Sequence, residues 1–251
     1  GPLGMVDIFT AFYFHILNHN PKKPDWEERD RLILSNGHIV PVRYATMAHA
    51  GYFKLDELKT LRKFGTRLQG HPERERLPGV ENVSGPLGSG LSQAAGIALG
   101  ARMDDKNFRV YCLMSDGEHD AGNTWEGAMF AAKNNLSNLT GIIDRNNIQI
   151  NGMTEDVMPL EPLRDKWEAF NWHVLEVDGH NIEAFVDAVG QAQAIAEKPT
   201  VIIAHTIPGK GIKEIEGDYL WHGKPPKDKD EEQKFLKELR TLRGKIESEH
   251  E

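Results

Sequence analysis

Four short apolar runs constrain the fold of this chain more than any other sequence feature. They cover residues 110–114, 141–144, 173–177 and 200–205, and helical patterns cover 122–135 and 182–196 between them. Short buried strands that alternate with helices favour a parallel sheet with helices on both faces. We therefore predict an α/β fold. Because ligands of such folds bind beyond the carboxyl ends of the strands, a site is expected in the residues that follow each run.

Composition excludes several classes of protein. The 251 residues carry 30 Lys and Arg against 38 Asp and Glu, a net charge of −8, so we expect no nucleic acid partner. No apolar run approaches the roughly 18 residues of a membrane span, so no membrane partner is expected either. The single cysteine, Cys112, excludes an internal disulfide framework and a cysteine-rich zinc site. A soluble protein of a reducing compartment, the cytoplasm, is the expectation.

The two ends of the chain are expected to lie outside the main domain, which we place at residues 5–226. Residues 1–4, Gly-Pro-Leu-Gly, are typical of the remnant left when a protease removes a purification tag. Residues 6–17 are typical of a short buried helix. Residues 227–251 are rich in charge, which fits a solvated tail. A docked amphipathic helix fits equally well, because apolar side chains recur on one helical face at Phe235, Leu239, Leu242 and Ile246.

A first candidate site follows the run 110–114, which ends in Ser115-Asp116-Gly117 before a helix begins. Glycine lets the backbone approach a phosphate closely, and a helix N-terminus offers free N–H groups. Asn146 follows the next run, 30 residues after Asp116. One strand–helix–strand unit separates them, so both side chains are expected at one edge of the sheet, where their oxygens could share a Mg²⁺ ion. Either motif taken alone is more often a simple turn.

Three of the 11 histidines lie in loops rich in Gly and Pro, namely His38, His71 and His222. An imidazole on a loop can hydrogen-bond a sugar hydroxyl or move protons near neutral pH, although each one alone is more often structural. Five others have no motif around them and are expected to be structural: His15, His19, His119, His173 and His250.

A second glycine-rich loop, Gly-Pro-Leu-Gly-Ser-Gly at 85–90, precedes a helix that is dense in small residues. The loop suits close approach of the backbone to a flat ligand. The helix, at 90–103, is a candidate for packing against another polypeptide, although tight packing within the chain would also explain it.

Taken together and in order, these segments resemble the amino-terminal half of the transketolases. The motifs are SNGH, GHPE, GPLGSG, SDGEHDAGNTWEGAM, IDRNNI, and TIPGKG followed by WHGKP, within residues 6–226. The Asp-Gly pair and the later Asn are similar to the thiamine diphosphate motif, although Ser115 stands where that motif begins with Gly. The resemblance implies the thiamine diphosphate-binding (PP-type) fold. It also implies transfer of a two-carbon glycolyl unit from a ketose phosphate to an aldose phosphate.

The resemblance implies roles for individual residues. The divalent cation, Mg²⁺ or else Ca²⁺ or Mn²⁺, would bind the side chains of Asp116 and Asn146 and the carbonyl of Ile148. The substrate channel would be lined by His38, His71 and His222, which would assist proton transfers. Backbone contacts to the aminopyrimidine would come from Gly85, Leu87 and Gly88. Gly117 and Glu118 would lie at the diphosphate, Lys224 there or at the substrate entrance, and Ile150 and Ile207 would pack on the cofactor.

The family's pyrimidine-binding domain, which carries the glutamate that activates the cofactor, has no counterpart in these residues. A second polypeptide is therefore expected to supply it, in an α2β2 heterotetramer. Three departures from the family pattern bear on activity. The amino-terminal Ser-Gly-His-Pro-Gly segment is absent, Ala121 stands where many members have Glu, and Pro208 where related members have Lys.

These departures leave two alternatives open. The chain would be a non-catalytic shortened homologue or scaffold subunit, or else part of a related thiamine diphosphate enzyme. The second class includes deoxyxylulose phosphate synthases and 2-oxo acid decarboxylases, and the SNGH and WHGKP motifs speak against it.

Overall fold

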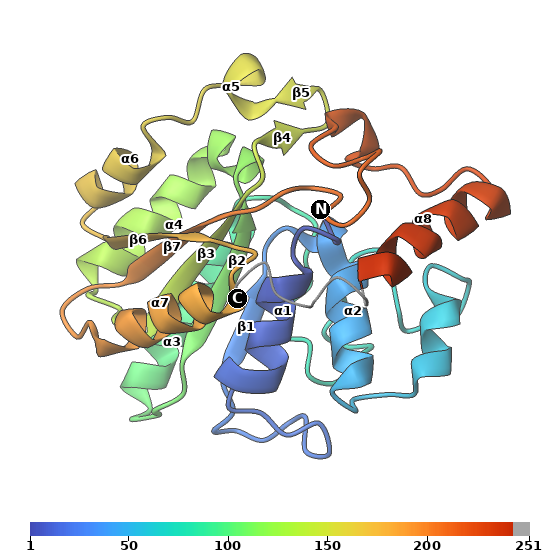
Figure 1. Cartoon of the computed structure of the whole chain (residues 1–251). Coiled ribbons are helices and arrows are strands. Elements are labelled where there is room, and N and C mark those ends of the chain that lie inside the picture. The colour runs from blue at the N-terminus through green and yellow to red at the C-terminus, as the bar shows by residue number, and fades with distance from the viewer. Residues whose placement is uncertain (243–251) are drawn as a thin grey trace.

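A five-stranded parallel sheet lies at the centre of the molecule, in the order β1-β2-β3-β7-β6 (Figure 1). The computed structural model describes residues 1–242. Its sheet contains β1 (Arg31–Leu34), β2 (Val110–Ser115), β3 (Leu139–Arg145), β6 (His173–Asp178) and β7 (Thr200–His205). All neighbours pair in parallel, so their carboxyl ends share one edge. A separate antiparallel pair, β4 (Ile148–Gln149) and β5 (Gly152–Met153), follows β3.

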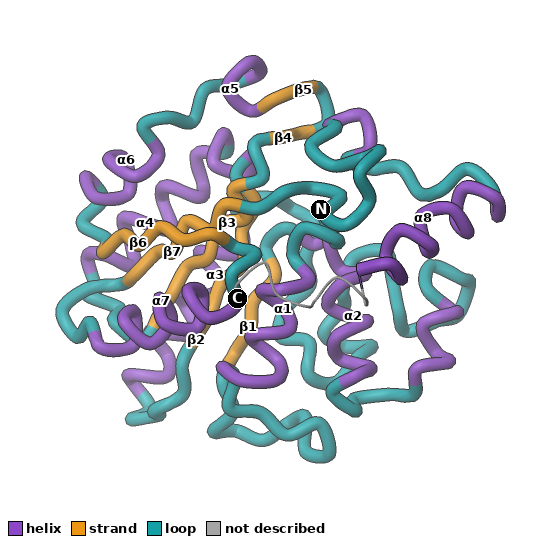
Figure 2. Tube along the Cα trace, viewed as in Figure 1, coloured by secondary structure: helices purple, strands orange, loops and turns teal. Residues whose placement is uncertain are grey.

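Helices cover both faces of the sheet (Figure 2). One face packs against α1 (Val6–Ala11), α2 (Val40–His49) and α7 (Ile182–Ala194). The other packs against α3 (Ser89–Met103), α4 (Gly122–Lys133) and α6 (Leu163–Ala169). The single turn α5 (Thr154–Val157) and the helix α8 (Lys229–Leu242) lie outside these layers.

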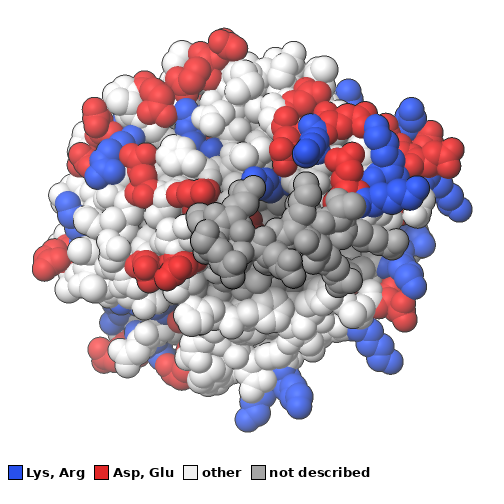
Figure 3. All heavy atoms as spheres, viewed as in Figure 1, with Lys and Arg blue, Asp and Glu red and all other residues white. Residues whose placement is uncertain are grey.

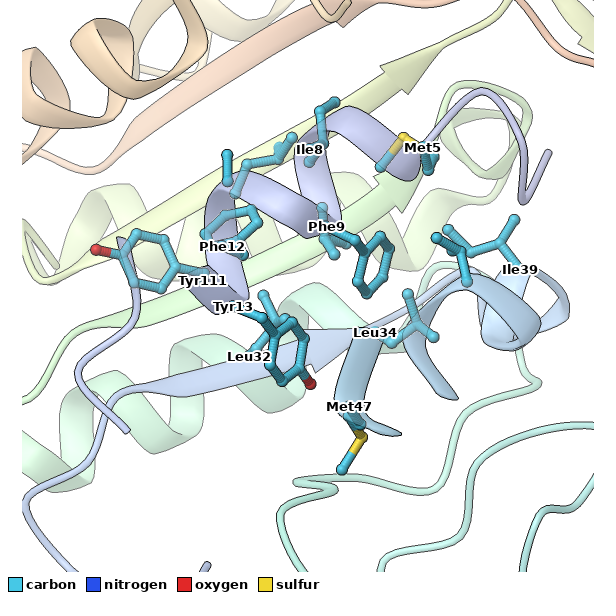
Figure 4. Close-up of a cluster of buried hydrophobic side chains, with 14 of the residues drawn as sticks. Met5, Ile8, Phe9, Phe12, Tyr13, Leu32, Leu34, Ile39, Met47 and Tyr111 are labelled. Atoms are coloured by element: carbon cyan, nitrogen blue, oxygen red, sulfur yellow. The ribbon is translucent and has the colours of Figure 1, made fainter. Parts of the chain in front are cut away.

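Burial on both faces explains why the strands are continuous apolar runs rather than alternating ones. In β2, Tyr111 and Leu113 join the cluster under α1, α2 and α7, whereas Cys112 and Met114 join the cluster under α3, α4 and α6. Figure 4 shows part of the first cluster, where the ring of Phe12 meets Tyr111 edge-on, with centroids 5.1 Å apart. The sheet is therefore a rigid platform for the loops at its carboxyl edge.

The predicted elements agree closely with this architecture. The four apolar runs are β2, β3, β6 and β7, and the two helical patterns are α4 and α7. The helix expected at 6–17 is α1, continued by a wider, π-helical turn at Phe12–Ile16. The strand β1 was not predicted, because its apolar part is only three residues long, Leu32 to Leu34.

The carboxyl-terminal segment forms a docked helix as far as it is described. In α8 the side chain of Phe235 is only 5% exposed and packs with Ile212, Ile215 and Trp221. Acidic and basic side chains are interspersed around this helix on the face drawn in Figure 3. Ile246, His250 and the side chain of Leu242 lie outside the described part of the chain.

Residues 1–4 lie against the domain rather than away from it. The side chain of Leu3 packs on the same cluster as Phe235, and the ammonium of the half-buried Gly1 lies near Asp144. Whether these residues are a remnant of tag removal stays a prediction.

Within residues 1–242, no helix has both the length and the apolar character needed to cross a bilayer.

Candidate functional site

The first candidate site lies where β2 and β3 end. These strands are paired in parallel, with Ser115 opposite Asp144, so Asp116 and Asn146 emerge side by side at the carboxyl edge, as predicted. The Asp116 carboxylate accepts hydrogen bonds from the backbone N–H groups of Gly117 (2.8 Å) and Asn147 (2.7 Å). The Asn146 amide oxygen accepts from the N–H of Ile148 at 3.1 Å. Carboxylate and amide oxygens that follow two neighbouring strands therefore lie at the same edge of the sheet.

Two buried carboxylates lie close together there. Asp116 and Asp144 are both 1% exposed. Burial, and then the negative charge of Asp144, raises the pKa of Asp116 to about 7. The pKa of Asp144 is also raised by burial, against hydrogen bonds from Thr206 Oγ1 and the Asn146 side-chain amide. A cation at this point would offset the repulsion.

The donor set fits a hard divalent cation. Within residues 1–242, no group of three or more His, Cys, Asp or Glu side chains is placed to hold a metal ion. A site here would instead combine one carboxylate, one side-chain amide oxygen and one backbone carbonyl, from Asp116, Asn146 and Ile148. That set suits Mg²⁺, which takes few protein oxygens and fills its octahedron with water and phosphate.

Arg145 connects the carboxyl edge of the sheet to residues 154–161. Its guanidinium, 3% exposed, donates to Asp116 (3.2 Å), Thr154 (2.8 Å), Glu155 (2.8 Å) and Glu161 (2.9 Å). The Asp116 carboxylate is thereby oriented by a side chain as well as by backbone. Arg145 was not predicted, because a charged residue that ends a strand gives no local signal of its partners.

Glu118 joins three loops of the site. Its buried carboxylate accepts from Ser35 Oγ (2.6 Å), the N–H of Gly88 (2.7 Å) and the N–H of Ser115 (2.7 Å). Burial raises the pKa of Glu118 to about 7, against these three hydrogen bonds. Gly88 has a left-handed φ of 80°, and a Cβ there would lie 2.2 Å from Asn123 Oδ1. Glu118 thus joins the glycine-rich loop to the end of β2, directly before Asp116.

The three loop histidines come together. The rings of His38 and His222 have centroids 5.4 Å apart, and His71 lies beside Gly37 and Gly85. Burial lowers the pKa of His38 to about 4, and the charges of His222, the chain's amino terminus and His71 add to the effect. The pKa of His222 is lowered by burial and by the amino terminus. Its buried Nδ1 has no hydrogen-bond partner among the described residues, as expected of an atom that would bond a ligand.

A cavity of about 630 Å³ lies beside these rings. Of the predicted site residues, its walls include His38, Ile148, His222 and Lys224. Most of the other lining residues are apolar residues from 208–239, and Gly1–Leu3, Pro41, Leu61, Arg62, Asp218 and Glu232 also contribute. Three predicted contacts are not among the lining residues and leave much of their side chains exposed: Leu87 (42%), Ile150 (75%) and Ile207 (38%). The other predicted site residues are also outside the lining: His71, Gly85, Gly88, Asp116, Gly117, Glu118 and Asn146.

Two further observations concern histidines. His119 is buried against Trp125 and Trp167, and its Nδ1 lies 3.0 Å from the carbonyl oxygens of Ser115 and Asp116, a structural setting. His180 was missed. It follows β6 at the same sheet edge and contacts Ile207, so searching the residues after every strand, rather than after two, would have found it.

A family model described as "Transketolase, thiamine diphosphate binding domain" matches residues 1–241. The chain is 44% identical over 222 residues to a 6-deoxy-6-sulfo-D-fructose transketolase subunit from Clostridium sp. (strain MSTE9), covering 88% of this chain and 81% of that relative. It is 40% identical over 251 residues to an apulose-4-phosphate transketolase subunit from Phocaeicola vulgatus, covering 100% of this chain and 88% of that relative.

Similarity to longer transketolases covers a smaller share of their length. The crystal structure of transketolase from Campylobacter jejuni matches with a TM-score of 0.89 and 35% identity, over 97% of this chain but 38% of that one. Human transketolase is 39% identical over 225 residues, which cover 88% of this chain and 35% of the human protein. The chain thus spans most of the subunit relatives and about a third of the longer ones.

Proposed function

Because the chain belongs to the transketolase family, through its thiamine diphosphate-binding domain, we propose that it is the cofactor-binding subunit of a split transketolase. Its activity would be transfer of a two-carbon glycolyl unit from a ketose to an aldose. Two comparisons support this: the chain covers more than four-fifths of two relatives named as transketolase subunits, but little more than a third of the single-chain enzymes.

One observation carries the proposal. Asp116 and Asn146 end neighbouring parallel strands, and the Ile148 that follows them lines the cavity beside His38 and His222. Oxygen donors for a cation and imidazoles for a sugar therefore share one edge of the sheet. Thiamine diphosphate, when bound, supplies the carbon nucleophile that carries the two-carbon unit.

The residues of this chain would divide the work of binding. Asp116, Asn146 and the Ile148 carbonyl would hold the divalent cation, and Gly117 would lie at the diphosphate. Backbone atoms of Gly85, Leu87 and Gly88 would contact the aminopyrimidine, on a loop that Glu118 fixes from below. Ile150 and Ile207 would be covered by the cofactor, which would explain why both are exposed here. Lys224 would lie at the entrance.

The histidines would bind sugar hydroxyls and move their protons. His38 is neutral at physiological pH, because its pKa is about 4, so its ring can accept a proton from a hydroxyl as a carbon–carbon bond breaks. His222 offers a buried nitrogen with no partner in the described chain. His71, which is exposed, would complete the channel from the opposite loop.

A partner chain is part of the proposal. It would carry the pyrimidine-binding domain and its activating glutamate, in an α2β2 heterotetramer. The helices α3 and α4 suit such packing, because Gly96 and Gly100 leave their positions open and Met129 and Phe130 are more than 40% exposed.

The substrate would be an anionic sugar. The two subunit relatives are named for 6-deoxy-6-sulfo-D-fructose and for apulose 4-phosphate, which carry a sulfonate and a phosphate. We propose that this chain, with its partner, takes a ketose of the same class, bearing a phosphate or a sulfonate, as donor.

Reconstitution tests the function. The chain is mixed with a partner chain that carries the pyrimidine-binding domain, with thiamine diphosphate and Mg²⁺, and supplied with ketose and aldose phosphates. Glycolyl transfer that needs both chains would support the proposal. If the complex forms but no glycolyl transfer is detected, a scaffold role would be favoured. Carbon dioxide released from pyruvate would favour a decarboxylase or deoxyxylulose phosphate synthase.

A further inference from the structure

His180 connects two segments that are distant in the sequence. It follows β6 in the turn Asp178-Gly179-His180, and its side chain is 12% exposed. Its Nε2 accepts a hydrogen bond from the backbone N–H of Ile207 at 2.8 Å. Its Nδ1 lies 2.9 Å from Asp7 Oδ2 in the first turn of α1. The imidazole thus bridges the amino-terminal helix and the loop after β7.

These two contacts fix the tautomer of the ring. A backbone N–H can only donate, so Nε2 must present its lone pair to Ile207. The ring proton is then on Nδ1, from where it donates to the Asp7 carboxylate. Both nitrogens are engaged, so neither is free to exchange a proton with a bound sugar.

The loop that His180 holds also reaches the candidate cation site. Thr206, the residue before Ile207, donates its hydroxyl proton to Asp144 Oδ1 at 2.5 Å, and the Asn146 amide donates to Asp144 Oδ2 at 3.0 Å. The backbone N–H of Thr206 donates to the carbonyl of Arg145 at 3.2 Å. His180 thus holds Ile207 and Asp144 holds Thr206, so two consecutive residues of the loop are fixed at the strand ends.

We propose that Asp7 and His180 are a positioning pair, which fixes the backbone of Ile207 and through it the wall of the thiamine diphosphate site. Asp7 orients the imidazole and holds its tautomer, and Nε2 holds Ile207. The inference rests on the proposed function, because that function makes Ile207 a cofactor contact. Neither residue touches the cofactor in this arrangement.

The hydrogen bond itself is tested by amide exchange in the full chain, without cofactor. In His180→Ala the Ile207 amide should exchange about tenfold faster, since one hydrogen bond of ordinary strength is lost. In His180→Gln it should stay within about threefold of wild type, because the glutamine oxygen can accept from Ile207 while its amide donates to Asp7. His205→Ala is the matched control: that ring is half exposed, is bonded to Glu176 and lies two residues from Ile207.

Cofactor binding supplies the second readout, in the complex with the partner chain. The dissociation constant of thiamine diphosphate at saturating Mg²⁺ should rise about tenfold in His180→Ala and return to near wild type in His180→Gln. Turnover should follow the same order. Asp7→Ala, which removes the acceptor opposite Nδ1, should speed Ile207 exchange in the same direction by a smaller factor, and it serves if His180→Ala does not fold.

Two results would overturn the proposal. Unchanged Ile207 exchange in His180→Ala would show that the ring does not hold the loop. A His180→Gln complex that binds cofactor normally but has lost turnover would show that His180 moves protons, a catalytic role. Failure of the wild-type complex to bind thiamine diphosphate would instead refute the proposed function. The Ile207 amide exchange would still test whether His180 holds the loop.

Discussion

The backbone N–H of Gly88 donates to Glu118 Oε2 at 2.7 Å, across thirty residues of sequence. The same carboxylate oxygen accepts from Ser35 Oγ at 2.6 Å. One buried side chain therefore fixes the position of the glycine-rich loop relative to the loop that carries His38. Both the stability of the protein and its dependence on pH should follow from this arrangement.

Replacing Glu118 with alanine should destabilise the fold strongly. The change leaves Ser35, Gly88 and Ser115 with buried donors and no acceptor, which should lower the free energy of unfolding by about 3 kcal/mol or more. Chemical denaturation measures it. Glu126→Ala, on the exposed face of α4, is the control and should change stability by less than about 0.5 kcal/mol. A loss below about 1 kcal/mol in Glu118→Ala would contradict the three-loop role.

The pH dependence of stability should also change when Glu118 is made non-titrating. Its pKa rises from 4.5 unfolded to about 7 folded, so the folded state binds the extra proton and this contribution to stability is lost as pH rises through 7. Relative to Glu118→Gln, wild type should therefore lose about 3 kcal/mol between pH 4.5 and 7. Paired denaturation curves in EDTA check this, and a pH-independent difference would refute it.

Removing Asp116 should strongly weaken cation-dependent cofactor binding. We expect Asp116→Ala to weaken thiamine diphosphate binding in the complex by about 100-fold at a fixed Mg²⁺ concentration, with a similar loss in Asn146→Ala. Tryptophan fluorescence titration measures both. Asp120→Ala, an exposed carboxylate four residues away, should bind as wild type does. An unchanged affinity in Asp116→Ala would show that the cation assignment is wrong.

His38 should act in turnover rather than in cofactor binding. Because its pKa is about 4, it is neutral throughout pH 5–8, and its protonation should not produce an acidic limb in that range. His38→Asn should lower kcat by about 100-fold and leave the cofactor dissociation constant within about threefold. Steady-state kinetics and titration separate the two effects. His49→Asn, an exposed histidine at the end of α2, is the comparison.

Residues 1–4 should compete with cofactor. The Gly1 ammonium lies beside Asp144 and contributes to the lowered pKa of both His38 and His222. A chain that begins at Met5 should bind thiamine diphosphate more tightly, by about threefold or more, in the same titration. Leu3→Ala, which alters the apolar packing but keeps the ammonium, separates the two causes. Equal affinities in all three proteins would mean that the segment does not enter the site.

The sequence predicts most of this architecture because the strands are unbroken apolar runs with polar residues directly after them. The neighbouring positions of Asp116 and Asn146 follow from that pattern alone. The interactions of Arg145 and Glu118 do not, since their partners come from loops up to 83 residues away. Predicting them requires the order in which strands lie side by side, which local spacing does not contain.

The histidines illustrate the same limit. His38 and His222 lie 184 residues apart in sequence and come together only because a parallel sheet brings every loop to one edge. His180 was overlooked since its motif, Asp-Gly-His, is that of an ordinary turn. Ile150 and Ile207 differ, because for them the resemblance implies packing contacts that this chain alone does not form, and their side chains are exposed.

The carboxylate beneath the loops also limits how this protein can be redesigned. The loops that hydrogen-bond to Glu118 must be replaced together. If a glycine-rich loop is grafted from a relative without the matching residue at position 35, a buried donor is left without its acceptor. The segment at 219–224 shares no hydrogen bond with Glu118 in the described chain, yet carries His222 and Lys224 at the cavity wall. Engineering a new sugar preference should therefore begin there, with His222 and the packing residue Trp221 retained.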